Sequence, residues 1–153
     1  MYKHIFIMLL AGVLGVLVGC ARKPPDSTPE GALDAFLRAI EETPNDPGAP
    51  ARAYALLDPA AREAIRTRAA RANAITGKAV TAEGMLSPLW TPMRFSVERT
   101  STTIDAGGLR AVVDVYGVDP TTQHVRVPLV REGDRWRVVM VVPDVKIADQ
   151  PEE

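Results

Sequence analysis

The residue with the most distinctive chemical setting is the single cysteine of this 153-residue chain, Cys20. One thiol can form neither an internal disulfide nor a multi-cysteine zinc site, which leaves covalent modification or intermolecular chemistry as its uses. The segment from Ile5 to Val18 carries no charged residue and follows the positively charged Lys3. At fourteen residues it is shorter than the roughly 20 that a membrane-spanning helix needs. It therefore predicts the hydrophobic region of a signal peptide.

A second group of reactive side chains lies in the C-terminal half of the chain: Asp114, Tyr116, His124 and Arg126. An aspartate and a histidine could perform acid–base chemistry if both lay in a cleft. His124 is the only histidine after Cys20, which excludes a histidine-rich metal site. The chain also lacks a Gly-Lys-Ser/Thr phosphate loop, a Gly-x-Ser-x-Gly elbow and a His-Glu-x-x-His motif. We therefore expect no catalytic residue, metal or cofactor, and interpret the four residues as a surface contact.

The residues Leu17-Val18-Gly19-Cys20 resemble the lipobox of bacterial lipoproteins. The resemblance implies that residues 1–19 are a signal peptide, that cleavage falls between Gly19 and Cys20, and that Cys20 receives a diacylglycerol and further acylation such as palmitate. At about 0.8 kcal/mol per buried methylene, such an anchor makes detachment from the membrane negligible. Ala21 stands where many inner-membrane lipoproteins have aspartate, so the resemblance favours the cell envelope, on the periplasmic side of the outer membrane.

Composition limits the remaining chain to one domain with an aliphatic core. Only 5% of residues are aromatic, and the formal net charge is -1. A balanced charge excludes a dedicated nucleic-acid binder, which needs a basic excess to neutralise phosphates.

The sequence also divides the chain after the signal peptide into three parts. We expect a lipidated cysteine and a stiff, solvated tether containing a Pro-Pro pair over residues 20–27. We expect a folded domain over residues 28–143 and a disordered tail over residues 144–153.

The elements that must position Asp114 and His124 are helices followed by strands. Helices are expected at 29–42, 51–57 and 59–73, with Thr28-Pro29 and Asp58-Pro59 as starts and Gly77 as a stop. Strands are expected at about 94–104, 109–118, 123–131 and 135–142, separated by turn residues. This order predicts an α+β fold, with N-terminal helices packed on a curved antiparallel sheet of about four strands.

Alternation along the strands divides the side chains between two faces. Leu109, Ala111, Val113 and Val115 are expected on the core side, together with Arg99 and Arg131 at strand ends. The four candidate residues then face away from the helices. Side-chain matching places Tyr116 opposite His124, Asp114 opposite Arg126 and Leu129 opposite Val138, although a shift of two residues satisfies the same alternation.

Three short motifs occur in a fixed order along the domain: Pro29-Glu30-Gly31-Ala32, Leu56-Leu57-Asp58-Pro59 and Gly133 to Trp136. Over roughly residues 28–142 this order resembles lipoprotein members of the nuclear transport factor 2-like superfamily. The resemblance implies a cone-shaped fold whose sheet wraps the helices around an apolar pocket. Ketosteroid isomerases and polyketide cyclases of the superfamily place Asp, His or Tyr in that pocket, whereas Asp114, Tyr116 and His124 have outward alternation here.

Two functions follow from these features. The favoured one is a non-enzymatic envelope module, held to the membrane by its lipid, that binds a protein partner or a second copy through the outer sheet face. The alternative is a small-molecule enzyme or carrier, isomerase-like or cyclase-like, that uses the apolar cone pocket. The arginines of the 59–73 helix give it a basic surface that is either simply solvated or a contact for lipid phosphates or a polyanionic wall component.

Replacing Cys20 with alanine should abolish lipid attachment, because the chain has no second thiol to accept the diacylglycerol. Metabolic labelling with a radioactive fatty acid, followed by membrane fractionation, checks this. The Cys20→Ala chain should be unlabelled and either uncleaved or soluble. A labelled, membrane-bound Cys20→Ala chain would refute lipidation at this residue.

Overall fold

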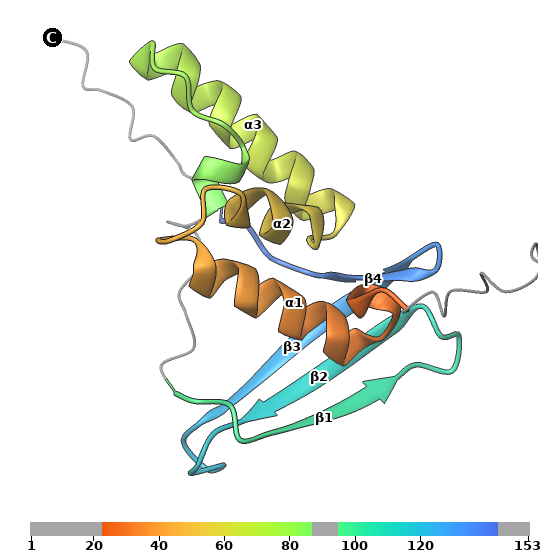
Figure 1. The fold of residues 1–153 in the computed structure, drawn as a ribbon. Helices are drawn as coiled ribbons and strands as arrows, with labels where there is room; N and C mark the ends of the chain where they lie inside the picture. The colour runs from red at the N-terminus through yellow and green to blue at the C-terminus, as the bar shows by residue number, and fades with distance from the viewer. Residues whose placement is uncertain (1–22, 87–94, 144–153) are drawn as a thin grey trace, which may run out of the picture.

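The computed structural model describes residues 23–86 and 95–143. Within these ranges the chain is α+β, with three α-helices and one four-stranded antiparallel sheet (Figure 1). The elements are η1 Pro25–Ser27, α1 Pro29–Glu42, α2 Ala49–Ala55, α3 Pro59–Thr76, η2 Glu83–Met85, β1 Arg99–Ile104, β2 Arg110–Tyr116, β3 His124–Glu132 and β4 Arg135–Val138. The predicted signal peptide, Gly19, Cys20 and the tail at 144–153 lie outside the described residues.

The helix starts follow from local capping chemistry. The Thr28 hydroxyl accepts a hydrogen bond from the Gly31 amide, and the Asp58 carboxylate accepts from the Ala60 and Ala61 amides. A proline follows each cap, where its missing N–H costs nothing. Gly77 ends α3 with a φ of 65°, a left-handed conformation that favours glycine. The prediction for α1 is confirmed, while α2 begins two residues earlier than predicted and α3 ends three residues later.

The sheet has the order β1-β2-β3-β4, and its registers confirm the side-chain matching. Tyr116 lies opposite His124, Asp114 opposite Arg126 and Leu129 opposite Val138. β4 ends at Val138, earlier than predicted, beside Pro128. The Val139 amide donates to the Pro128 carbonyl, but the proline has no N–H to return that bond, and the ladder ends there.

The hydrophobic core lies between α1 and one face of the sheet. Leu33 and Phe36 of α1 pack in the same buried cluster as Val113, Val115 and Trp136, and α1 lies across the strands in Figure 1. Alternation thus assigned most core positions correctly. Leu109 is one exception, since it precedes β2 and is 62% exposed.

The free edge of β4 is covered by the connection between α2 and α3. The Val138 amide donates to the Leu56 carbonyl at 2.8 Å, and the Asp58 amide donates to the Val138 carbonyl at 2.9 Å. These bonds form a parallel bridge between Leu57 and Val138. The connection between α2 and α3 therefore holds both helices at the β4 edge of the sheet, as Figure 1 shows.

The prediction of a solvated tether over residues 20–27 is wrong for Pro25–Ser27. These residues form η1, in which the Asp26 carboxylate is buried and accepts hydrogen bonds from Arg135 at 2.5 Å and Arg137 at 2.6 Å. A Cβ on Gly31 would lie 2.0 Å from the Pro25 carbonyl oxygen, so only glycine allows η1 to pack this closely on α1. The folded unit thus begins before Thr28.

Burial acts to raise the pKa of Asp26, but the hydrogen bonds from Arg137 and Arg135 outweigh it and hold the pKa below its ordinary value. Arg137 also donates to Glu132, and its own pKa is raised despite its burial. A carboxylate with a lowered folded-state pKa stabilises the fold above its unfolded pKa. That contribution is lost as the pH falls through the folded pKa.

Replacing Asp26 with asparagine should lower the free energy of unfolding by about 1 to 3 kcal/mol at neutral pH, because two partly buried guanidinium groups lose a charged acceptor. Urea denaturation checks this, and the difference from wild type should shrink as the pH falls below the ordinary aspartate value of about 3.9. Asp34→Asn is the control: Asp34 pairs with Arg38 at an exposed site, so the expected loss is about 0.5 kcal/mol or less. Equal losses for both variants would contradict a stabilising role for the contacts of Asp26 with Arg135 and Arg137.

Candidate functional site

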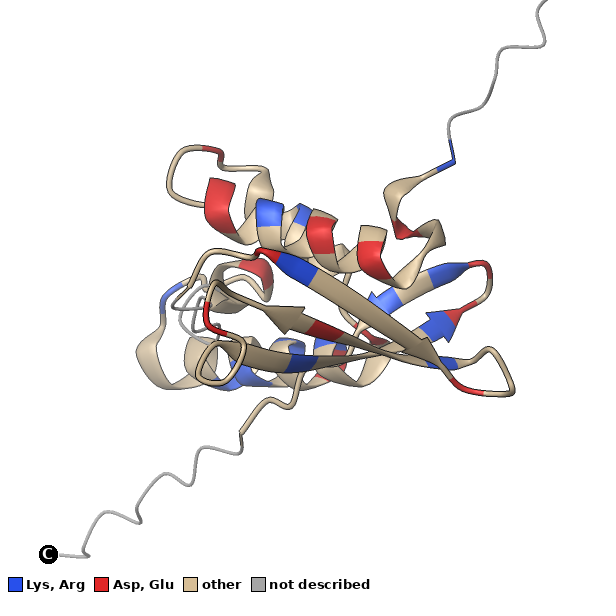
Figure 2. Ribbon diagram, turned by 90° about the horizontal axis from the view of Figure 1, so that it is seen from below, with Lys and Arg blue, Asp and Glu red and all other residues tan. Residues whose placement is uncertain are grey.

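The four residues predicted as a surface contact lie together on the outer face of the sheet. Asp114 and Tyr116 belong to β2, and His124 and Arg126 belong to β3, directly opposite in register. Their strand neighbours Val113 and Val115 point to the core instead. The outer face carries charged residues of both signs, and Figure 2 shows blue and red positions distributed over the strands.

Asp114 is the centre of a small ionic cluster. Its Oδ1 lies 2.8 Å from His124 Nε2 and 3.3 Å from Arg126 Nε. The Asp114 side chain is 18% exposed, while that of Arg126 is 68% exposed. A carboxylate only accepts hydrogen bonds, so Nε2 of His124 carries the proton in this contact. The strand register therefore places the half-buried Asp114 carboxylate next to two more exposed groups, the His124 ring and the Arg126 guanidinium.

An aromatic stack lies next to this cluster. The rings of Tyr116 and His124 are 4.5 Å apart between centroids and inclined by 3°. The guanidinium of Arg99 lies over the Tyr116 ring, 4.2 Å from its centroid. Three neighbouring strands thus each contribute one planar group. Cation–π and stacking contacts hold these three polar groups in fixed orientations on the outer face.

Arg99 is the member of this site that the sequence assigned wrongly, because it was expected on the core side. In the structure Arg99 lies opposite Tyr116, and six residues separate the paired positions Ile104 and Ala111. An even loop of that length sets the outward alternation of Arg99. Extending the side-chain matching to β1 would have found it.

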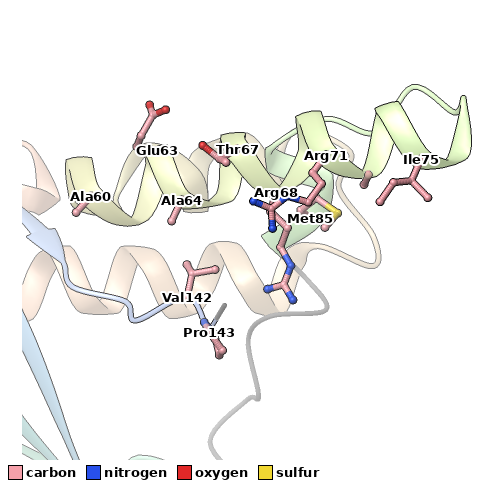
Figure 3. A pocket seen from close by; sticks show the side chains of 11 residues that line it. Ala60, Glu63, Ala64, Thr67, Arg68, Arg71, Ile75, Met85, Val142 and Pro143 are labelled. Atoms are coloured by element: carbon pink, nitrogen blue, oxygen red, sulfur yellow. The ribbon is translucent and has the colours of Figure 1, made fainter. Parts of the chain in front are cut away.

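The paired Asp114 and His124 resemble half of an acid–base site, but they lie on the outer face of the sheet. Two grooves lie elsewhere, on the helical side of the molecule. One, of about 690 Å³, is lined by α3, Met85, Val142 and Pro143 (Figure 3). The other, of about 560 Å³, lies among η1, α1 and α2. None of the four outer-face residues lines either groove.

Over 23–86 and 95–143 no group of three or more His, Cys, Asp or Glu side chains is placed to hold a metal ion. In the same part of the chain no helix combines the length and apolar character needed to cross a membrane.

Comparison with known proteins returned no match to a family model, a curated protein or a solved structure. The site is therefore interpreted from its own geometry.

Asp114 and Val115 are chain neighbours on opposite faces of β2, which makes them a matched pair for testing the exposure of the site. Asp114→Ala should cost about 1 kcal/mol of unfolding free energy, because the partners His124 and Arg126 are more exposed and stay solvated when the carboxylate is removed. Val115→Ala should cost about 2 kcal/mol or more, because it leaves a cavity in the core. Urea denaturation of both variants checks this, and an equal or larger loss at Asp114 would contradict a surface role.

Proposed function

We propose that this chain is a lipid-anchored envelope lipoprotein that acts as a non-enzymatic interaction module, with the outer sheet face as its contact surface. The observation that carries the proposal is the cluster of Arg99, Asp114, Tyr116, His124 and Arg126, which is fixed by strand register and open to solvent. Arginine and tyrosine are the residue types that dominate binding energy at protein interfaces. Their orientation by stacking lowers the entropy lost on binding.

The lipobox supports the anchor, and the position of η1 refines its geometry. Three residues separate Cys20 from Pro24, where the described contacts of the fold begin. At about 3.3 to 3.6 Å per residue, this connection reaches at most about 14 Å. A lipidated Cys20 would therefore hold the domain against the membrane surface, in the proposed case the periplasmic side of the outer membrane.

We also infer a relationship to the nuclear transport factor 2-like superfamily, with its cone-shaped fold. The order of α1, α2 and α3 before an antiparallel sheet supports it. The three motifs support it further, because each lies at a junction: Pro29–Ala32 opens α1, Leu56–Pro59 joins α2 to α3 along β4, and Gly133–Trp136 forms the turn into β4.

The alternative is an isomerase-like or cyclase-like enzyme, or a carrier, that uses an apolar pocket. It has the apolar groove beside α3 in its favour. It is the weaker proposal, because Asp114, Tyr116 and His124, which would have to supply the chemistry, lie outside both grooves. Acid–base catalysis needs a titratable group within hydrogen-bond reach of its substrate.

A photo-crosslinking amino acid at Arg126, introduced in the intact lipoprotein in its own cells, tests the contact surface. The same group at Glu41, an exposed residue on α1, is the control. Irradiation should give a discrete adduct from position 126 only, and its mass distinguishes a second copy from another protein. No adduct, or the same adduct from both positions, would overturn the outer sheet face as the contact surface.

A further inference from the structure

The groove beside α3 is an apolar channel between that helix and the segment that follows β4. Ala60 and Ala64 lie along one side, Val142 and Pro143 form the other, and Met85 and Ile75 lie toward the C-terminal end of α3. Figure 3 shows this arrangement, with the small alanine side chains leaving the space open. Ile75 is 65% exposed, which is a large apolar surface to leave in water. The volume of about 690 Å³ falls in the roughly 300–1,000 Å³ range of small-molecule sites.

The arginines of α3 divide into two that are neutralised and two that are not. Arg62 pairs with Glu132, and Arg66 pairs with Glu63. Arg68 and Arg71 both line the groove. No carboxylate among the described residues pairs with either of them.

Arg68 carries the more specific signal. Its Nη1 atom is buried and has no hydrogen-bond partner among the described residues. A buried donor without an acceptor is costly, and more so when it belongs to a charged group. Arg68 and Arg71 extend from α3 into the groove (Figure 3). The groove walls are mostly apolar, and the other polar residues that line them are Thr67 and Glu63, whose carboxylate is paired with Arg66. Arg68 and Arg71 supply guanidinium groups without a carboxylate partner at one place, which is the complement of a molecule with an aliphatic chain and a single anionic head.

We propose that this groove binds a free fatty acid, with its carboxylate on Arg68 and Arg71 and its chain along α3 toward Ala60. A guanidinium presents paired N–H donors that match a carboxylate. Arg71 lies eleven positions after Ala60 on α3, a rise of about 16 Å at 1.5 Å per residue, which accommodates an extended chain of medium length. This site is independent of the outer sheet face and does not rest on the proposed function.

Isothermal titration of the chain spanning residues 21–153 with dodecanoate tests the proposal, since this chain retains every residue of the described fold. Dodecanol, which has the same aliphatic chain without the charge, is the ligand control. Dodecanoate should bind in a 1:1 ratio, and dodecanol should bind at least about tenfold more weakly, as expected when a hydrogen bond to a charged group is lost.

Two variants and one control locate the site. Arg68→Gln should weaken dodecanoate binding about tenfold or more, and Ala64→Phe, at an exposed alanine of the groove wall, should block it. Arg62→Gln should leave the affinity unchanged, because neither Arg62 nor its partner Glu132 lines the groove. Thermal unfolding of each variant, with a midpoint close to that of wild type, shows that the fold is retained.

Several outcomes would overturn the proposal. Dodecanol binding as tightly as dodecanoate would show a merely apolar surface, and equal losses for Arg62→Gln and Arg68→Gln would show non-specific attraction to positive charge. Absence of binding to residues 21–153, with binding to a chain that ends at Pro143, would show that residues 144–153 cover the groove and no external fatty acid does. Absence of binding to both chains would refute the site. None of these results bears on crosslinking from the outer sheet face, so the two proposals fail separately.

Discussion

The fold depends on β4, a strand of four residues that is hydrogen-bonded on both sides. On one side it pairs with β3, and on the other Val138 exchanges bonds with Leu56 and Asp58. Among the described residues, the second set supplies the main-chain hydrogen bonds between the α2–α3 connection and the sheet, and it covers an edge that would otherwise be exposed to other chains. Its core-facing residues Trp136 and Val138 are buried in the same cluster as α1. One short strand thus joins the helical layer to the sheet.

Two aspartates, Asp58 from the α2–α3 connection and Asp26 from η1, stabilise this junction. Asp58 caps α3 with one carboxylate oxygen, while the other accepts from the Met140 amide just after β4. Asp26 binds the two arginines on the opposite face of β4, Arg135 and Arg137. Both carboxylates are buried, and both are satisfied by hydrogen bonds, as buried charges must be to avoid a desolvation penalty. The hydrogen bonds of Asp26 and Asp58 therefore fix the position of β4 more tightly than the small aliphatic core alone would.

What could be predicted from the sequence was local or periodic. Caps at Thr28 and Asp58 gave the starts of α1 and α3, and alternation combined with side-chain matching gave the β2–β3 register, in which Asp114 lies opposite Arg126. The role of Asp26 could not be found in this way, because Arg135 and Arg137 are more than a hundred residues away in the chain. The lack of an ion-pair partner for Arg68 could not be predicted either. The sequence shows several arginines on one helix, but it does not show which of them lie next to a carboxylate in the fold.

The outer sheet face and the groove beside α3 depend on the contact between β4 and the α2–α3 connection to different degrees. The outer sheet face is positioned by strand register, whereas the fatty-acid groove exists because α3 and the segment after β4 diverge from the same Asp58–Val138 contact. Native-state hydrogen exchange of the Val138 and Asp58 amides tests this junction most directly. Both amides should exchange only through global unfolding, with a free energy equal to that from urea denaturation and to that of the β2–β3 amides. Faster exchange at Val138 and Asp58 through local opening, while β2 and β3 stay protected, would contradict a central role for β4.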